Sequence, residues 1–197
     1  QAKAAAERFL DRAIPDNRVE EITRQMERQT QNLLLIGMPG CGKTTVGQIL
    51  TDRLGRPLAD VDHQVEAEAG CSIPDLFAQE GEEGFRVREH RALCQLSKQS
   101  GQVIACGGGL PTRAEAIAAL KASGVVFWLN REPALIYDTV SMARRPLGQG
   151  GKEAFLERFR QREPIYRRWA DYIIEGHAQA AEAAGRIAAL YERECQA

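Results

Sequence analysis

The sequence predicts an α/β fold of three layers, in which a central parallel sheet of about five strands has helices on both faces. Short continuous apolar runs alternate with longer amphipathic segments along most of the chain. Such runs are typical of strands that are buried on both faces, as the strands of parallel sheets are. A glycine-rich turn also joins the first run directly to a helical segment, which favours strand–helix units over hairpins.

The first half of the predicted sheet begins at residues 33–36, where consecutive apolar residues indicate a buried strand. A glycine-rich turn leads into a helix over 43–54, which has apolar residues at helical spacing and ends at Gly55. Ser72 is a suitable cap for a later helix. We therefore expect a second strand at 57–61, followed by helices at 62–69, 73–79 and 82–99.

The second half repeats this alternation of strands and helices. A third strand at 103–106 ends in Gly107-Gly108-Gly109, and another glycine-rich stretch occupies 147–151. Proline is tolerated in the first turn of a helix, so Pro133 suits a helix start. We expect two more strands, at 125–129 and 172–174, and helices that begin at 133 and cover 153–168 and 178–194.

The composition excludes several classes of protein. The chain has 197 residues, 44% of them hydrophobic, which suits one domain with an ordinary core. Its net charge is −1 and its Lys and Arg are scattered, so we expect no nucleic-acid partner. No apolar run is long enough to cross a membrane, so no membrane association is expected. The five cysteines lack metal-ligand spacing and are expected to be reduced thiols in a cytoplasmic protein.

Residues 1–30 differ from the rest of the chain in being rich in Ala, Glu, Arg and Gln. Two short amphipathic helices fit this segment, at 2–12 and 17–29, with a break at Pro15. Neither helix carries a catalytic constellation. The sequence therefore predicts a helical N-terminal extension or linker over 1–30 and one α/β domain over 31–197.

A phosphate-binding motif follows the first strand. Residues 37–44, GMPGCGKT, match the pattern G-x-x-x-x-G-K-[ST], with a buried strand before them and a helix after them. The glycines let successive backbone N–H groups point at one anion, and the helix N-terminus adds its positive end. Lys43 is expected to reach the β- and γ-phosphates of a nucleotide, and the Thr44 hydroxyl to bind Mg²⁺. The predicted nucleotide-binding residues are Gly40, Cys41, Gly42, Lys43, Thr44 and Thr45.

Two carboxylates, Asp60 and Asp62, stand at the carboxyl end of the second predicted strand. Residues two apart on a strand share one face, so both can point toward the phosphate-binding turn. One carboxylate can hold Mg²⁺ through water, and one can accept the proton of an attacking hydroxyl. The alternative is that Asp62 only caps the next helix while Asp60 is solvated.

Further motifs narrow the reaction. They are, in chain order, Asp60-x-Asp62, Gly84-Phe85-Arg86-x-x-Glu89, Gly107-Gly108-Gly109, Arg145-Pro146-Leu147 and Arg162-x-Pro164-x-Tyr166. With this set behind the phosphate-binding motif, residues 33–175 resemble the shikimate kinase family. The resemblance implies a P-loop kinase fold with inserted substrate-binding and lid segments. It also implies transfer of the γ-phosphoryl group of ATP to the 3-hydroxyl of shikimate, in the biosynthesis of chorismate and the aromatic amino acids.

The resemblance implies a role for each matched residue. Asp62 would bind the substrate hydroxyls and act as general base for the attacking one. Arg86 and Arg162 would grip the substrate carboxylate, since the planar fork of a guanidinium makes two parallel bonds to it. Phe85 would form an apolar wall. Close approach of the substrate to the main chain would be allowed by Gly107, Gly108 and Gly109.

Arg145 would lie on a glycine-rich lid, bind the ATP phosphates and support charge on the transferring group. The catalytic residues implied in this way are Lys43, Asp62 and Arg145, with ATP and Mg²⁺ as cofactors and Thr44 and Asp60 as metal ligands. Closure of the lid would exclude water and limit wasteful hydrolysis of ATP.

Two positions depart from the family pattern. Cys41 stands where serine is common, and Asp138 stands where the family often has a basic residue near the adenine. Because the residue at position 41 contributes mainly its backbone N–H, we expect phosphate binding to survive. Simpler interpretations also exist: Arg86 could form surface ion pairs in a charged helix, the glycine triplet could be a plain turn, and Arg162 could lie on a solvated face.

Residues 1–10 resemble the closing helix of a shikimate dehydrogenase. One hypothesis is therefore that the chain is the C-terminal part of a bifunctional enzyme, with a fused or partner dehydrogenase domain. Two alternative functions are a kinase for another small polyol acid such as gluconate, and a non-catalytic sensor that binds a small aromatic acid. A sensor need not keep Lys43, Asp62 and Arg145 together, so the presence of all three favours catalysis.

Overall fold

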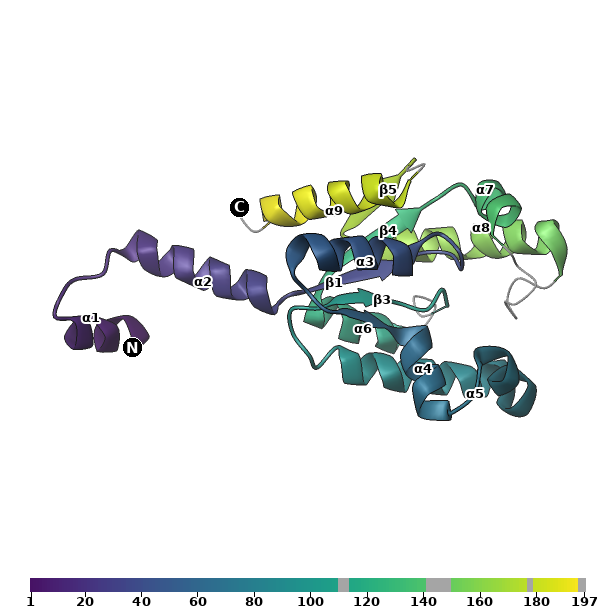
Figure 1. The fold of residues 1–197 in the computed structure, drawn as a ribbon, viewed down its shortest axis with the longest axis horizontal. Helices are drawn as coiled ribbons and strands as arrows, with labels where there is room; N and C mark the ends of the chain where they lie inside the picture. Colours follow the sequence, from purple (N-terminus) through teal and green to yellow (C-terminus); the bar gives the residue numbers. More distant parts are fainter. Residues whose placement is uncertain (110–113, 141–149, 177–178, 195–197) are drawn as a thin grey trace.

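The computed structural model describes residues 1–109, 114–140, 150–176 and 179–194, arranged around one parallel sheet (Figure 1). The strands of these ranges lie in the order β2-β3-β1-β4-β5, and every neighbouring pair is parallel. Leu34 of the central strand pairs with Ile104 on one side and with Val126 on the other. The strands are β1 (Asn32–Ile36), β2 (Leu58–Asp60), β3 (Val103–Ala105), β4 (Gly124–Asn130) and β5 (Tyr172–Glu175).

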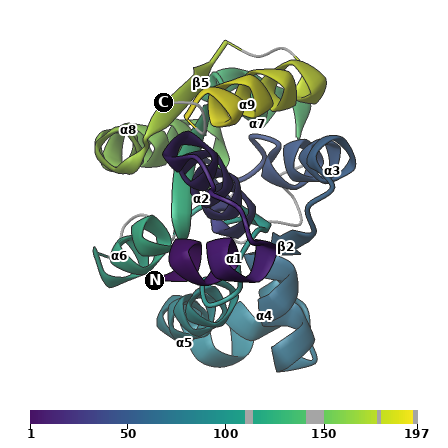
Figure 2. The same ribbon diagram turned by 90° about the vertical axis from the view of Figure 1, so that its left-hand side faces the viewer.

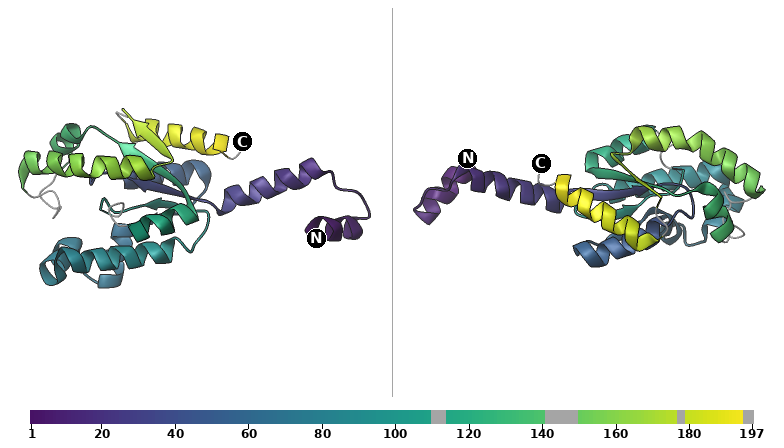
Figure 3. Two further views of the ribbon diagram at one scale, coloured as in Figure 1. Left: turned by 180° about the vertical axis from the view of Figure 1, so that it is seen from behind. Right: turned by 90° about the horizontal axis from the view of Figure 1, so that it is seen from above.

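Helices cover both faces of the sheet, which gives the three layers seen in Figures 2 and 3. On one face α3 (Lys43–Leu54) packs beside α9 (Ala180–Glu194). On the other face lie α6 (Ala114–Ser123) and α8 (Gly151–Trp169). This arrangement confirms the predicted fold class. It also explains the unbroken apolar run at residues 33–36, since every residue of β1 is buried.

Three further helices lie at the edges of these layers. Beyond the β2 edge lie α4 (Val61–Ala69) and α5 (Ile73–Leu96), while α7 (Pro133–Thr139) packs against α8. Helix α5 breaks at Gly81, whose φ of 69° is in the left-handed region. This break separates two helical segments, as predicted for residues 73–79 and 82–99. Ser72 accepts a hydrogen bond from the Asp75 amide, as expected of a cap.

The N-terminal segment extends away from the sheet (Figures 1 and 3). Its helices are α1 (Ala2–Leu10) and α2 (Asp16–Thr30), close to the two helices predicted there. Helix α2 runs directly into the amino end of β1, at the opposite end of this strand from the phosphate-binding turn. Phe9 is 90% exposed and Met26 is 61% exposed, so this segment contributes little to the core. Within the described ranges, no helix combines the length and apolar character needed to cross a membrane.

Candidate active site

A cavity of about 700 Å³ opens at the carboxyl ends of β1, β2 and β3. Ligands of open α/β sheets bind at this end of the strands, because the loops that follow neighbouring strands meet there. The cavity wall brings together most of the residues that the sequence singles out. They are Gly40, Gly42, Lys43, Thr44, Thr45, Asp60, Asp62, Phe85, Arg86 and Gly108.

The phosphate-binding turn wraps around the N-terminus of α3. Gly40 and Gly42 have φ of 84° and 105°, a conformation that side-chain-bearing residues rarely adopt. Lys43 lies inside the turn, where its ammonium donates to the carbonyls of Gly37, at 3.0 Å, and Met38, at 3.1 Å. Cys41 is 2% exposed, so its thiol is enclosed by protein while its main chain completes the turn. A helix N-terminus behind such a turn is a ready site for phosphate.

Thr44 and Asp60 meet at the edge of the cavity. The Thr44 hydroxyl donates a hydrogen bond of 2.7 Å to Asp60 Oδ2. The other oxygen of Asp60 accepts from the backbone amides of Asp62 and His63, at 3.0 and 3.4 Å, and so caps α4. A hydroxyl beside a carboxylate is a donor set that suits Mg²⁺, which binds through one or two carboxylates together with substrate phosphates. The residues at this site therefore fit the expected cation.

Asp62 belongs to the first turn of α4, where it lines the cavity. The prediction that Asp60 and Asp62 share one face of a strand is wrong, because the capping by Asp60 starts the helix at Val61. The alternative that Asp62 caps this helix is also wrong, since Asp60 does so. A Cβ atom added to Gly107 would lie 3.1 Å from Asp62 Oδ1, which places this carboxylate over the glycine triplet.

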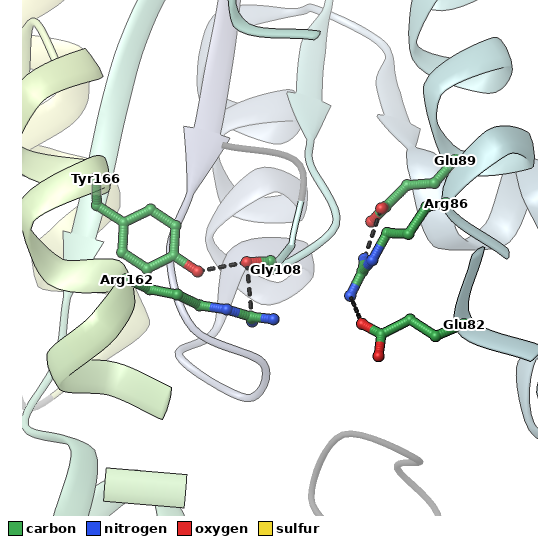
Figure 4. Close-up of polar contacts among 6 residues, drawn as sticks. All are labelled: Glu82, Arg86, Glu89, Gly108, Arg162 and Tyr166. Atoms are coloured by element: carbon green, nitrogen blue, oxygen red, sulfur yellow. Dashed lines mark hydrogen bonds and ion pairs between the residues drawn. The ribbon is translucent and has the colours of Figure 1, made fainter. Parts of the chain in front are cut away.

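Arg86 comes from the second half of α5 and is buried beside the cavity (Figure 4). Its side chain is 8% exposed and forms ion pairs of 2.6 Å with Glu89 and 3.0 Å with Glu82. Burial alone would lower the pKa of Arg86, but the charges of Glu89 and Glu82 outweigh it and raise that pKa. The interpretation of Arg86 as a member of surface ion pairs is therefore right in the pairing and wrong in the exposure, since the side chain is buried. Its guanidinium stays charged.

Glu89 is a buried carboxylate of the cavity wall that the motif contains but for which the sequence predicted no role. Its side chain is 2% exposed, Oε2 bonds to Arg86, and Oε1 has no hydrogen-bond partner among the described residues. Burial raises the pKa of the Glu89 carboxyl, although the Arg86 guanidinium opposes the shift. The spacing of three residues on one helix was the available signal, because such residues are neighbours on the helix surface.

The glycine triplet lets these side chains approach the main chain. A Cβ atom on Gly107 would come within 1.8 Å of Glu89 Oε1, and one on Gly109 within 2.3 Å of Arg86 Nη1. Neither position has a left-handed φ, so the requirement for glycine is steric. The triplet is therefore more than a plain turn, because the ion pair of Arg86 with Glu89 packs directly against it.

Arg162 and Tyr166 reach the same triplet from α8, opposite Arg86 (Figure 4). Arg162 is 8% exposed, and its Nη1 donates a hydrogen bond of 3.2 Å to the carbonyl of Gly108. The hydroxyl of Tyr166, which is fully buried, donates to the same carbonyl. The interpretation of Arg162 as part of a solvated face is wrong. For Tyr166, the only signal in the sequence is its place in the motif Arg162-x-Pro164-x-Tyr166.

The remaining predictions concern the cavity wall and the lid. Phe85 is 3% exposed, and its ring packs against Phe77 with centroids 4.8 Å apart, as an apolar wall requires. Asp138 pairs with Lys152 of α8 at 2.7 Å, so a basic side chain does lie next to this position. Arg145 lies outside the described residues, as do residues 147–149 of the glycine-rich stretch.

These features define a class of protein. A buried strand, a phosphate-binding turn and a helix form a nucleotide cradle, and a hydroxyl–carboxylate pair suits a divalent cation. A carboxylate and two buried guanidiniums lie next to this cradle, where they can orient a small anionic acceptor. The fold and the site are therefore those of a P-loop phosphotransferase that acts on a small molecule.

Comparisons with known proteins identify the family. The family model described as shikimate kinase matches residues 39–192. A shikimate kinase of Cupriavidus pinatubonensis is 41% identical over 169 residues, which cover 82% of this chain and 86% of that protein. A shikimate kinase of Thiobacillus denitrificans is 39% identical over 163 residues, covering 81% and 88%. This chain belongs to the shikimate kinase family.

Solved structures agree with this assignment. The shikimate kinase of Acinetobacter baumannii in complex with shikimate superposes with a TM-score of 0.80 at 35% identity, covering 87% of this chain and 98% of that one. A gluconokinase of Sinorhizobium meliloti has a TM-score of 0.50 at 14% identity, covering 85% and 97%, which shows a shared fold alone. The expectation of an enzyme of the shikimate kinase family is thus confirmed.

Proposed function

We propose that this kinase transfers the γ-phosphoryl group of Mg-ATP to the 3-hydroxyl of shikimate and so forms shikimate 3-phosphate. The observation that carries the proposal is the approach of Arg86 and Arg162 to the glycine triplet from opposite sides, beside the phosphate-binding turn. Two guanidiniums suit the single carboxylate of shikimate. The product is an intermediate in the biosynthesis of chorismate. We place the enzyme in the cytoplasm, because the four cysteines among the described residues are free thiols, as is usual in a reducing compartment.

The described residues divide the work of phosphoryl transfer. Lys43 neutralises charge on the β- and γ-phosphates, for which its ammonium turns from the carbonyls of Gly37 and Met38 toward the anion. Thr44 and Asp60 would hold Mg²⁺, which would supply positive charge against the negative phosphates. Arg145 of the lid adds a further positive charge, as the family resemblance implies.

Asp62 acts on the acceptor. Its carboxylate lies over Gly107 at the cavity wall, to which Lys43 and Arg86 also belong. From the cavity wall it can accept the proton of the attacking hydroxyl, while the two guanidiniums hold the substrate at its carboxylate end. Holding a substrate at one end and activating it at the other aligns the hydroxyl with the phosphorus atom.

A coupled assay of ADP release tests this proposal. Mg-ATP is supplied with shikimate, gluconate, quinate or no acceptor, to the wild type and to Asp62→Asn. We expect release only with shikimate, and a fall in kcat of at least about 10²-fold in the variant, which is the effect of losing a general base. Asp52→Asn, an exposed aspartate of α3 outside the cavity wall, is the matched control.

Two outcomes would overturn the proposal in different ways. Turnover with gluconate in preference to shikimate would assign the chain to another class of acceptor. Binding of ATP or of an aromatic acid without turnover would make the chain a sensor, and the roles given to Lys43 and Asp62 would then fail.

We further propose that residues 1–30 are a helical extension of the catalytic domain 31–197, through which a dehydrogenase domain is fused or docked. Exposed apolar side chains on α1 and α2, Phe9 and Met26 among them, support a contact with another domain. Deleting residues 1–27 is expected to leave kcat for shikimate phosphorylation unchanged. Assaying the source protein for oxidation of shikimate tests the fused or partner enzyme.

A further inference from the structure

The carbonyl oxygen of Gly108 receives two donors from one face of α8. Tyr166 donates its hydroxyl, and Arg162, one turn earlier, donates Nη1 at 3.2 Å (Figure 4). A carbonyl oxygen has two lone pairs, so both bonds can exist together. The two donors differ in what else they can do. A guanidinium has five N–H groups, whereas a tyrosine hydroxyl has a single proton to donate.

The packing around Tyr166 holds its side chain in one position. Its side chain is fully buried, and its ring stacks on Trp128 of β4 with centroids 5.8 Å apart. Burial raises the pKa of Tyr166 well above its ordinary value, so the hydroxyl keeps its proton. Arg162 is the more adaptable of the two, because its long side chain ends in a fork that can turn to another acceptor.

Gly108 is also fixed from the side of the phosphate-binding turn. A Cβ atom added to it would lie 2.8 Å from Cδ of Pro39, so the proline ring packs directly on this glycine. The Tyr166 hydroxyl lies 3.9 Å from Sδ of Met38, the neighbouring residue of the same turn. The glycine triplet, the phosphate-binding turn and α8 therefore meet at Tyr166.

We propose that Tyr166 is a positioning residue: it is the permanent donor to the Gly108 carbonyl, and this frees Arg162 to turn its guanidinium to the substrate carboxylate. Without the tyrosine hydroxyl, any turn of Arg162 away from Gly108 would leave a half-buried carbonyl without its donor, which opposes substrate binding. The inference rests on the proposed function, in which Arg162 binds that carboxylate.

Tyr166→Phe tests this role by removing one oxygen and keeping the ring. Because a neutral hydrogen bond contributes about 1 kcal/mol, we expect the KM for shikimate to rise about five- to tenfold, while the KM for ATP changes less than about twofold. Tyr191→Phe is the matched control, because Tyr191 lies on α9, outside the cavity wall. The variant removes a hydroxyl that accepts a hydrogen bond of 2.8 Å from Arg56. We expect the control to leave both KM values unchanged.

A double-mutant cycle separates positioning from a loss of stability. If Tyr166 acts through Arg162, then Tyr166→Phe adds little to the KM for shikimate once Arg162→Ala is present. Equal rises in KM in the two backgrounds would overturn the proposal, as would a rise in both KM values in Tyr166→Phe. Absence of shikimate turnover in the wild type would instead overturn the proposed function.

An NMR measurement keeps the inference testable even if Tyr166→Phe folds poorly. Arg162→Ala retains the tyrosine, so the amide signal and hydrogen-exchange rate of Gly109, which follows the fixed carbonyl, are expected to stay close to those of the wild type. A large increase in exchange at Gly109 in this variant would show that Arg162 holds the loop. Tyr166 would then not be the permanent donor.

Discussion

Glu82 and Arg86 form an ion pair whose two ends differ in exposure. The pair is 3.0 Å long, with the Arg86 side chain 8% exposed and the Glu82 side chain 58% exposed. The buried guanidinium therefore has one carboxylate, Glu89, that is enclosed with it and another that reaches it from solvent. A substrate carboxylate that approaches Arg86 meets Glu82 as a competitor of the same charge.

The first prediction concerns this competition. Glu82→Gln is expected to lower the KM for shikimate two- to fivefold, because an exposed ion pair contributes about 0–1 kcal/mol. Steady-state kinetics measures the change. The control is Glu157→Gln on α8, a different helix, which removes an exposed ion pair with Arg160. This control should leave the KM for shikimate unchanged. A higher KM in Glu82→Gln would mean that Glu82 orients Arg86 and does not compete for it.

The second prediction concerns pH. The pKa of the Glu89 carboxyl is raised in the folded protein. Its protonation therefore contributes most to the free energy of unfolding at pH values below 4.5, the ordinary pKa of a glutamate. That contribution is lost as the pH rises through the raised value. Glu89→Gln has no proton to lose, so the wild type should lose stability relative to it in this window, by up to about 1.4 kcal/mol per pH unit.

Urea unfolding of both proteins, at a series of pH values upward from 4, measures this difference. Arg86 remains in both proteins and stays charged throughout, so it does not generate the slope. A difference between the two proteins that is constant over the series would contradict a raised pKa for Glu89.

The third prediction concerns the glycine triplet. Gly109→Ala places a methyl group 2.3 Å from Arg86 Nη1, so the guanidinium must move. We expect the KM for shikimate to rise at least about tenfold, the effect of losing a charge-assisted bond. Gly185→Ala of α9 is the control, since its nearest contact is 3.4 Å away at Arg53, and alanine favours a helix interior. An unchanged KM in Gly109→Ala would show that substrate binding does not depend on this position of Arg86.

The fourth prediction concerns the cation site. Thr44→Ala removes the hydroxyl that meets Asp60 at 2.7 Å, whereas Thr44→Ser keeps it. If that hydroxyl binds Mg²⁺, the alanine variant needs at least about tenfold more Mg²⁺ for half-maximal rate, and the serine variant stays near the wild type. Titration of the rate with Mg²⁺ at fixed ATP measures both. Equal loss in the two variants would point to the methyl group of Thr44.

Local sequence patterns predicted the elements well. Helix α3 begins at Lys43 and ends at Leu54 as predicted, because a glycine stands at each end and the apolar spacing between them is helical. The central strand was also predictable, since burial on both faces demands an unbroken apolar run. The start of α4 was placed one residue late, because Asp60 caps this helix by accepting from the amides of Asp62 and His63.

The contacts inside the site were less predictable. The helix that carries Arg86 is rich in charge and resembles a solvated surface helix, yet the fold buries this arginine together with Glu89. Tyr166 and Gly108 are distant in sequence, so their hydrogen bond depends on how α8 packs over β4 and on the strand order. A motif can identify such residues, but only the packing shows which atoms they contact.

The order of the segments along the chain also decides when, during synthesis, all residues of the acceptor pocket are present. The phosphate-binding turn, Asp62 and Arg86 all belong to segments that precede β4 in the chain. Arg162 and Tyr166 arrive only with α8, and β5, which completes the edge beside β4, follows it. A chain still emerging from the ribosome thus contains the residues of its nucleotide cradle before those that complete the acceptor pocket.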